Sequence, residues 1–252
     1  MKVKYFDITR PGLSIKCKLC TGDSHTFSDV VISCHGFGGN KDNAATEKLA
    51  QTLLPVRKDA AILSFDLPCH GNDVKQKLDL EDCLLYLDTV MGYARTELQA
   101  QRLFCFANSF GGYLALLRLH REGCAFEKTL LRCPAVGIGE ILKRDLAATN
   151  QLDLLAKKDA VLGFERKMKI SARFVGQLEE NDLSKWDYSQ LTENLLILHG
   201  TKDELVSHDE VEAFADQNGI DFLSIENADH MFRNPSKLRE VLDYTMEFFF
   251  SD

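Results

Sequence analysis

The stretch that decides the fold is "CFANSFGGYLALL", Cys105 to Leu117. Its first half is a short apolar run typical of a buried strand, and its second half has the apolar spacing of a helix. Ser109 stands at the turn between them, where it buries no apolar surface. A serine in this place either caps the helix that follows or is held out by the turn for chemistry.

The neighbours of Ser109 favour the second interpretation. Ala107 and Gly111 flank the serine and Gly112 follows, so the residues around the turn are small. Small residues are needed where a sharp strand-to-helix turn brings strand and helix together and strains the central residue. The pattern is the nucleophile elbow G-x-S-x-G with alanine at the first glycine, and it predicts a hydroxyl exposed at the carboxyl edge of a sheet. A simple helix N-cap remains the alternative for this motif taken alone.

Short apolar runs alternate with longer helical patterns along the rest of the chain. The runs end in turn residues, as in "DVVISCHGFGG", "AAILSFDLPCHG", "NLLILHGTKD" and "DFLSIENADH", and they are apolar rather than alternating. Such runs are typical of strands covered on both faces. Strands that alternate with helices predict an α/β fold, with a mostly parallel sheet and helices on both faces. The helical patterns lie at about residues 41–54, 79–98, 110–122, 208–218 and 236–250.

The N-terminal segment follows a different pattern. "KVKYFDIT" and "SIKCKLCTG" alternate and are joined by "RPG", which predicts an antiparallel hairpin. Cys17 and Cys20 have metal-ligand spacing, but no second such pair follows, and the alternation sends their side chains to opposite faces. The eight cysteines lie mostly in apolar runs, and we expect them to be reduced thiols.

One long segment interrupts the alternation of strands and helices. Roughly fifty residues separate "CPAVG" from "NLLILHG", far more than a crossover helix requires, and they carry the only tryptophan, Trp186. We expect a core of residues 1–136 and 190–252 and a cap at residues 137–189 over the ends of the strands. Insertions in such sheets often sit over the ligand crevice. A helical excursion packed on the sheet is the alternative.

Composition and charge limit the partners. The 252 residues are 45% hydrophobic and 27% charged, as expected for one globular domain with an insertion. A formal net charge of −8 without a basic cluster argues against nucleic acid. No apolar run is long enough to span a bilayer, and the N-terminus lacks the apolar region of a secretory signal, so a cytoplasmic location without membrane attachment is expected. Monomer and homodimer both remain open.

A serine hydroxyl is a weak nucleophile, so it needs a base and a group that orients the base. "HGTKDELV" supplies Asp203 just past a buried run, and "IENADHMF" supplies His230 past the next. Both follow the carboxyl ends of predicted strands, on the sheet edge predicted for Ser109, and Ser–Asp–His is the order expected for this elbow. We therefore predict a catalytic triad of Ser109, Asp203 and His230. Glu204 and Asp209 are weaker candidates for the acid.

Glycines at the end of an earlier strand predict a place for the oxyanion. "SCHGFGGN" puts Gly36 and Gly38 on either side of Phe37, and glycines let a backbone approach a substrate closely. A tetrahedral intermediate needs N–H donors aimed at its oxygen. The backbone N–H groups of Phe37 and Phe110 are the predicted donors, and Gly36 and Gly38 are predicted to line the substrate. A glycine turn that serves only the fold is the alternative.

Three further residues are predicted to contact substrate. His70, in "DLPCHGND", follows a strand and could line the site. Trp186 and Met231 are candidates for apolar lining, although a place in the core is an equally good interpretation. The other histidines are interpreted as structural or superficial: His199 beside a glycine at a strand end, and His25, His120 and His208 at the surface.

The pattern resembles the α/β-hydrolase family over nearly the whole chain. "HGFGG", "FDLPCHG", "ANSFGGY", "HGTKDELV" and "DHMF" look like motifs of small cytosolic bacterial esterases of the feruloyl/cinnamoyl-esterase type. The resemblance implies an α/β-hydrolase fold, an eight-stranded sheet with its second strand antiparallel, a cap insertion after strand six, and acyl-ester hydrolysis by a serine triad. The sequence departs from the family's "GHSxGG" at Ala107 and Asn108.

Together these patterns predict a serine hydrolase that cleaves small to medium carboxylic esters through an acyl-enzyme, without a cofactor or a metal. A thioesterase, amidase or aminopeptidase would use the same triad, and the sequence does not separate them. A non-catalytic binding protein with this fold is an alternative of a different class, but the intact triad argues against it. A metal hydrolase is disfavoured because no histidine–carboxylate cluster has ligand spacing.

Overall fold

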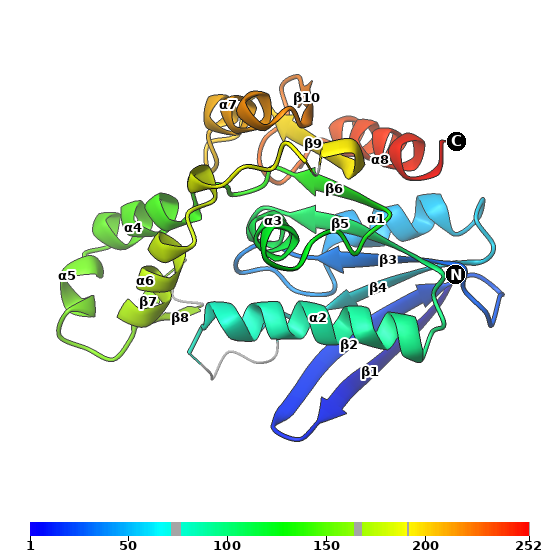
Figure 1. Cartoon of the computed structure of the whole chain (residues 1–252), viewed down its shortest axis with the longest axis horizontal. Coiled ribbons are helices and arrows are strands. Elements are labelled where there is room, and N and C mark those ends of the chain that lie inside the picture. Colours follow the sequence, from blue (N-terminus) through cyan, green and yellow to red (C-terminus); the bar gives the residue numbers. More distant parts are fainter. Residues whose placement is uncertain (72–76, 164–167, 191, 252) are drawn as a thin grey trace.

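The computed structural model describes residues 1–71, 77–163, 168–190 and 192–251. Within them, eight strands form one sheet in the order β1-β2-β4-β3-β5-β6-β9-β10 (Figure 1). Neighbours from β4 to β10 pair in parallel, whereas β2 pairs antiparallel with both β1 and β4, as the resemblance implied. The strands are β1 (Lys2–Arg10), β2 (Leu13–Thr21), β3 (Asp29–Cys34), β4 (Ala60–Phe65), β5 (Arg102–Asn108), β6 (Lys128–Arg132), β9 (Leu195–Gly200) and β10 (Asp221–Ile225).

The first two strands form the predicted hairpin. Pro11 and Gly12 make the turn, and Ile8 of β1 lies opposite Ile15 of β2. Cys17 and Cys20 of β2 lie in the hydrophobic clusters on opposite faces of the sheet, which confirms the predicted alternation. All eight cysteines fall within the described residues, and each is a free thiol.

Burial of the parallel strands follows their apolar composition. Every residue of β3, β4 and β9 is buried, because helices cover both faces of the sheet. β10 differs, since three of its five residues are exposed. The expectation that its run is covered on both faces is wrong for this strand, because β10 lies at the edge of the sheet and keeps one side open to solvent.

Helices lie on both faces of the sheet. α1 and α8 pack on the face that carries Phe104 and Phe106, and α2 and α3 pack on the face that carries Leu103 and Cys105. The observed helices agree closely with the predicted ranges, and Asp79 caps α2 by accepting a hydrogen bond from the N–H of Glu81. These helices are α1 (Ala44–Leu53), α2 (Leu80–Thr96), α3 (Phe110–Glu122), α7 (His208–Asn218) and α8 (Pro235–Phe250).

The insertion after β6 forms a group of short elements beyond the carboxyl ends of β3, β5 and β6 (Figure 1). Its helix α6 packs against α2, and its 3-10 turn η1 packs against α3. This is the side of the sheet where a cap was expected, while its limits at residues 137 and 189 remain a prediction. The elements are α4 (Ile138–Ala148), α5 (Leu152–Leu155), the β7–β8 hairpin (Val161–Gly163 and Met168–Ile170), α6 (Ala172–Glu180) and η1 (Leu183–Lys185); η2 (Thr192–Asn194) then leads into β9.

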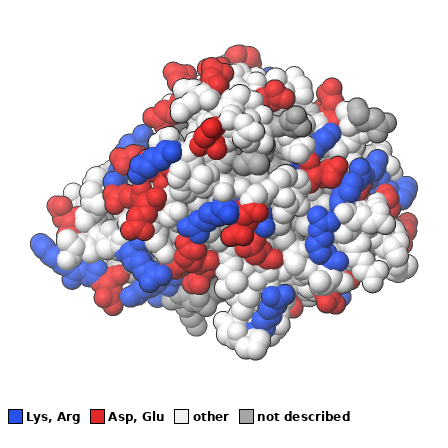
Figure 2. All heavy atoms as spheres, viewed as in Figure 1, with Lys and Arg blue, Asp and Glu red and all other residues white. Residues whose placement is uncertain are grey.

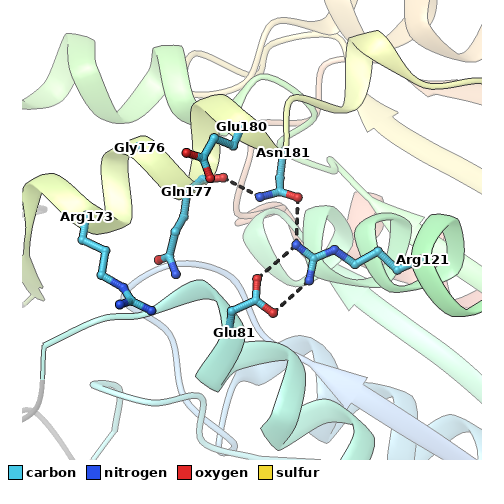
Figure 3. Close-up of a pocket in the computed structure, with 7 residues that line it drawn as sticks. All are labelled: Glu81, Arg121, Arg173, Gly176, Gln177, Glu180 and Asn181. Carbon is cyan, nitrogen blue, oxygen red and sulfur yellow. Dashed lines mark hydrogen bonds and ion pairs between the residues drawn. The ribbon is translucent and has the colours of Figure 1, made fainter.

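A polar network joins α6 to the core around a pocket of about 550 Å³ (Figure 3). Arg121 of α3 donates to both carboxylate oxygens of Glu81 at 2.9 and 3.0 Å and to the Asn181 side chain at 2.8 Å. Gln177 of α6 accepts the N–H of Leu80 at 3.1 Å. The pocket lies near the C-terminal end of α3, roughly 18 Å along the helix from the serine turn, so it belongs to the attachment of the insertion and not to that turn.

Charges of both signs are mixed over the surface. Figure 2 shows lysine and arginine interspersed with aspartate and glutamate on the visible face, without a continuous basic stripe. None of the helices in the described residues combines the length and the apolar character that crossing a membrane requires.

Candidate active site

The turn between β5 and α3 holds Ser109 in a strained conformation. Its φ of 52° and ψ of −116° lie outside the regions that non-glycine residues normally occupy. The turn is fixed from the neighbouring strand: the N–H of Ser109 donates to the carbonyl of Arg132 at 2.9 Å, and the carbonyl of Ser109 accepts the N–H of Ala135 at 3.1 Å. The Ser109 side chain makes no capping hydrogen bond to α3, so the N-cap interpretation has no support in the geometry.

Two glycines allow the loop after β3 to approach this turn. A Cβ atom added at Gly36 would lie 3.0 Å from the Cβ of Ser109. A Cβ added at Gly111 would lie 2.4 Å from the carbonyl oxygen of Cys34 and 2.8 Å from that of His35. Both positions are therefore glycine for lack of space, which places the predicted oxyanion loop directly against the serine.

Gly111→Ala is expected to destabilise the protein by about 3 kcal/mol, because the new methyl meets backbone atoms that cannot rotate away. Gly176→Ala is the matched control: that glycine is also in a helix, and an added Cβ has nothing within 4 Å. The control should be neutral or slightly stabilising. Urea unfolding of both variants measures the difference, and equal stability of the two would contradict the close contact of Gly111 with the carbonyl groups of Cys34 and His35.

Asp203 and His230 form a hydrogen-bonded, largely buried pair in the loops that follow β9 and β10. Asp203 follows β9, His230 follows β10, and the Nδ1 atom of His230 lies 2.6 Å from Oδ2 of Asp203. The Asp203 side chain is wholly buried, and the His230 side chain is 12% exposed. Ser109, Asp203 and His230 thus all follow parallel strands at their carboxyl ends, on one edge of the sheet, as predicted.

The loop around Asp203 stabilises the ionised carboxylate. The N–H groups of Leu205 and Val206 donate to Oδ1 at 2.9 Å each. Burial alone would raise the pKa of Asp203, but hydrogen bonds from His199 and His230 outweigh it and hold the pKa below its usual value. The group nearest the His230 imidazole is therefore an anion at neutral pH. The alternative acids, Glu204 and Asp209, are exposed.

Phe37 and Phe110, whose N–H groups are the predicted oxyanion donors, lie side by side. Their ring centroids are 5.1 Å apart. Phe110 is the first residue of α3, where backbone N–H groups have no acceptor within the helix. Phe174 of α6 is fully buried and packs on both rings, at 6.2 Å from Phe37 and 6.3 Å from Phe110. Sequence reasoning missed this contact, which joins the insertion to the predicted oxyanion residues.

His35 and His70 form a buried pair behind Phe37. Their rings are 4.9 Å apart, and the His70 ring meets the Phe37 ring edge-on at 5.6 Å. The Nε2 atom of His35 accepts the N–H of Leu67 at 3.1 Å, which ties the loop after β3 to the loop after β4. Burial lowers the pKa of His35 to about 4, and burial together with His35 lowers the pKa of His70 to about 3. Both rings are neutral near pH 7, and His70 supports Phe37 from within the fold.

The other residues predicted to contact substrate have different surroundings. Gly38 has a φ of +72°, so the turn requires a glycine there. Met231 is exposed beside His230. Trp186 stacks on His120 at a centroid distance of 4.1 Å, near the C-terminal end of α3. Trp186 is therefore in contact with the end of α3 remote from Ser109, and nothing in its position supports a contact with substrate at that serine.

Two groups of side chains in the described residues bring potential metal ligands together. Cys133, His199 and Asp203 place ligand atoms within 4.8 Å of one another, as do His208, Asp209 and Glu212. In the first group the Asp203 oxygens already accept hydrogen bonds, and in the second the carboxylates are exposed. The second group, at the start of α7, is a histidine–carboxylate cluster, so the expectation that the chain holds none is wrong there.

The sheet order, the helices on both faces and the serine at a strained strand-to-helix turn define the α/β-hydrolase fold. Solved structures of this fold match nearly the whole chain. Est1E from Butyrivibrio proteoclasticus matches with a TM-score of 0.72 at 18% identity, covering 97% of this chain and 98% of its own. Mouse alpha/beta hydrolase domain-containing protein 10 matches with a TM-score of 0.72 at 16% identity, over 98% of both chains.

The esterase domain of a Rhodothermus marinus protein matches with a TM-score of 0.69 at 17% identity, covering 97% of this chain and 96% of its own. No family model and no curated protein matches the sequence. Identities this low establish the fold alone, so the chemistry has to be argued from the site.

Proposed function

We propose that this protein is a serine hydrolase that cleaves carboxylic esters of small to medium acyl groups through an acyl-enzyme intermediate. The observation that carries the proposal is the 2.6 Å hydrogen bond between His230 and the buried Asp203, on the sheet edge where Ser109 stands in its strained turn. A base oriented by a buried anion, and a serine at the same edge of the sheet whose side chain caps nothing, are the groups that nucleophilic catalysis requires.

In the proposed mechanism the Oγ of Ser109 attacks the ester carbonyl while Nε2 of His230 takes its proton. Asp203 holds the Nδ1–H tautomer and stabilises the imidazolium that forms. The N–H groups of Phe37 and Phe110 donate to the oxyanion. His230 then gives the proton to the leaving alcohol, and a water molecule activated by His230 releases the acid from Ser109.

The names of two structures with this fold favour esters as substrates over thioesters and amides. Est1E was solved with ferulic acid bound, and the Rhodothermus marinus match is named an esterase domain. Within the chain, the partly exposed ring of Phe37 lies beside the predicted oxyanion donors, with the buried rings of Phe110 and Phe174 packed against it. We therefore propose that residues 137–189 act as a cap over an apolar acyl group.

Labelling with a fluorophosphonate probe tests the nucleophile. The native protein should be labelled covalently, and Ser109→Ala should not be. An unlabelled native protein, or equal labelling of the variant, would contradict the assignment. A panel of p-nitrophenyl acetate, p-nitrophenyl butyrate, methyl ferulate, acyl thioesters and p-nitroanilides then separates esterase from thioesterase, amidase and aminopeptidase activity.

A further inference from the structure

A second histidine contacts the proposed triad acid. His199 is the penultimate residue of β9, its side chain is wholly buried, and its Nε2 atom lies 3.2 Å from Oδ2 of Asp203. The same Nε2 atom lies 3.1 Å from the carbonyl oxygen of Val206. An ionised carboxylate and a carbonyl can only accept, so Nε2 must carry the proton. The other ring nitrogen, Nδ1, is buried without a hydrogen-bond partner among the described residues.

The lone pairs of the Asp203 carboxylate are all used. Oδ1 accepts the N–H groups of Leu205 and Val206, both at 2.9 Å, and Oδ2 accepts from His230 at 2.6 Å and from His199 at 3.2 Å. Two carboxylate oxygens offer about four acceptor sites. The carboxylate plane is therefore fixed by four donors, and the negative charge on Oδ2 is divided between two imidazoles.

We propose that His199 is a positioning residue that sets how strongly Asp203 stabilises the protonated form of His230; this rests on the proposed function. Because His199 draws part of the charge on Oδ2, Asp203 stabilises the His230 imidazolium less than an unshared carboxylate would. Removing the His199 donor should therefore strengthen the stabilisation of the His230 imidazolium by Asp203. His199 also keeps Oδ2 in line with Nδ1 of His230.

Other charged and titratable groups face this pair from the surrounding elements. Arg132, the last residue of β6, interacts electrostatically with Asp203, and its guanidinium lies 5.0 Å from the Phe232 ring centroid. Cys133, the next residue, interacts with Asp203 both electrostatically and through a side-chain hydrogen bond. The His208 ring lies 5.7 Å from that of His199. Asp229 interacts with Arg132. A substitution confined to His199 leaves these groups unchanged, so a shift in titration can be assigned to the lost hydrogen bond.

The structure offers a matched pair of substitutions. The ring of His199 stacks with that of Phe222 at 6.3 Å and an interplanar angle of 25°, so His199→Phe keeps an aromatic ring in this place but removes the donor. His199→Gln gives up the ring but keeps an N–H group that can reach Oδ2. A purely structural role predicts that the phenylalanine is the milder change, whereas a positioning role predicts that the glutamine is.

The test follows p-nitrophenyl butyrate hydrolysis from pH 4.5 to 9 and the His230 ring protons by NMR over the same range. In His199→Phe, we expect kcat at the high-pH plateau to fall about tenfold with KM nearly unchanged, because the lost hydrogen bond no longer keeps Oδ2 of Asp203 in line with Nδ1 of His230. We expect the acid limb of kcat/KM and the His230 titration midpoint to move upward together, by roughly half to one pH unit. His199→Gln should stay close to the native protein in its plateau kcat and in its His230 titration midpoint.

The NMR titration separates this proposal from the proposed function. If the native protein hydrolyses no ester, the proposed function fails, but an upward shift of the His230 midpoint in His199→Phe still supports the link through Asp203. If the midpoint and the kcat/KM profile of His199→Phe coincide with those of the native protein, the positioning role is wrong. Circular dichroism checks folding; if His199→Phe does not fold, an unchanged midpoint in a folded His199→Leu is the overturning result.

Discussion

Ser109→Ala is expected to lower kcat for ester hydrolysis by about 10⁴-fold or more, with little change in the free energy of unfolding. Without the Oγ atom no acyl-enzyme can form, and only water activated by His230 remains as a nucleophile. The variant keeps the strained turn, since alanine fits the φ of 52° no better and no worse than serine. Steady-state kinetics on p-nitrophenyl butyrate measure the first quantity, and urea unfolding measures the second.

Ser207→Ala provides the matched control for stability. The Ser207 side chain accepts the N–H of Glu210 and so caps α7, whereas the Ser109 side chain caps nothing. Removing a true N-cap costs about 1 kcal/mol. If Ser109 served only as a cap, its alanine variant would lose a similar amount of stability and keep its activity. That outcome would contradict the assignment of Ser109 as the nucleophile.

Much of the fold could be predicted because each element is determined by its own residues and near neighbours. The β1–β2 hairpin follows from an alternating pattern on both sides of Pro11 and Gly12, which sets the register that pairs Ile8 with Ile15. Helix α2 follows from its apolar spacing and from Asp79, which caps it. β10 was not predicted as an exposed edge, because the order of strands in a sheet depends on contacts between distant segments.

The site could be predicted where a residue lies in the loop that follows a parallel strand. Ser109 and Asp203 lie where the parallel strands β5 and β9 end, so strand direction alone places them on one edge. The contact of His199 with Asp203 depends on how the loop after β9 turns back over the strand, and the contact of Phe174 with Phe110 depends on the packing of the insertion. Neither of these two contacts can be predicted from the periodicity or the spacing of residues in the sequence.

Asp203→Asn is expected to lower kcat by about 10⁴-fold, through the tautomer of His230 rather than through lost packing. Asp203 is surrounded by donors on every side: the N–H groups of Leu205 and Val206, and the rings of His199 and His230. An amide at this position must turn its NH₂ group toward one of these donors. Backbone N–H groups cannot become acceptors, so the NH₂ group is expected to face the imidazoles.

The ring of His230 can meet that NH₂ group only by changing tautomer, with the lone pair on Nδ1 and the proton on Nε2. An imidazole that carries its proton on Nε2 cannot accept the proton of the Ser109 hydroxyl, so the nucleophile is present but not activated. In Asp203→Asn, kcat for p-nitrophenyl butyrate and the rate of fluorophosphonate labelling should therefore fall together, although Ser109 is intact. Asp209→Asn, which changes an exposed carboxylate in the first turn of α7, should alter neither. Activity within tenfold of the native protein in Asp203→Asn would mean that His230 does not depend on this carboxylate, and the proposed acid–base pair would have to be abandoned.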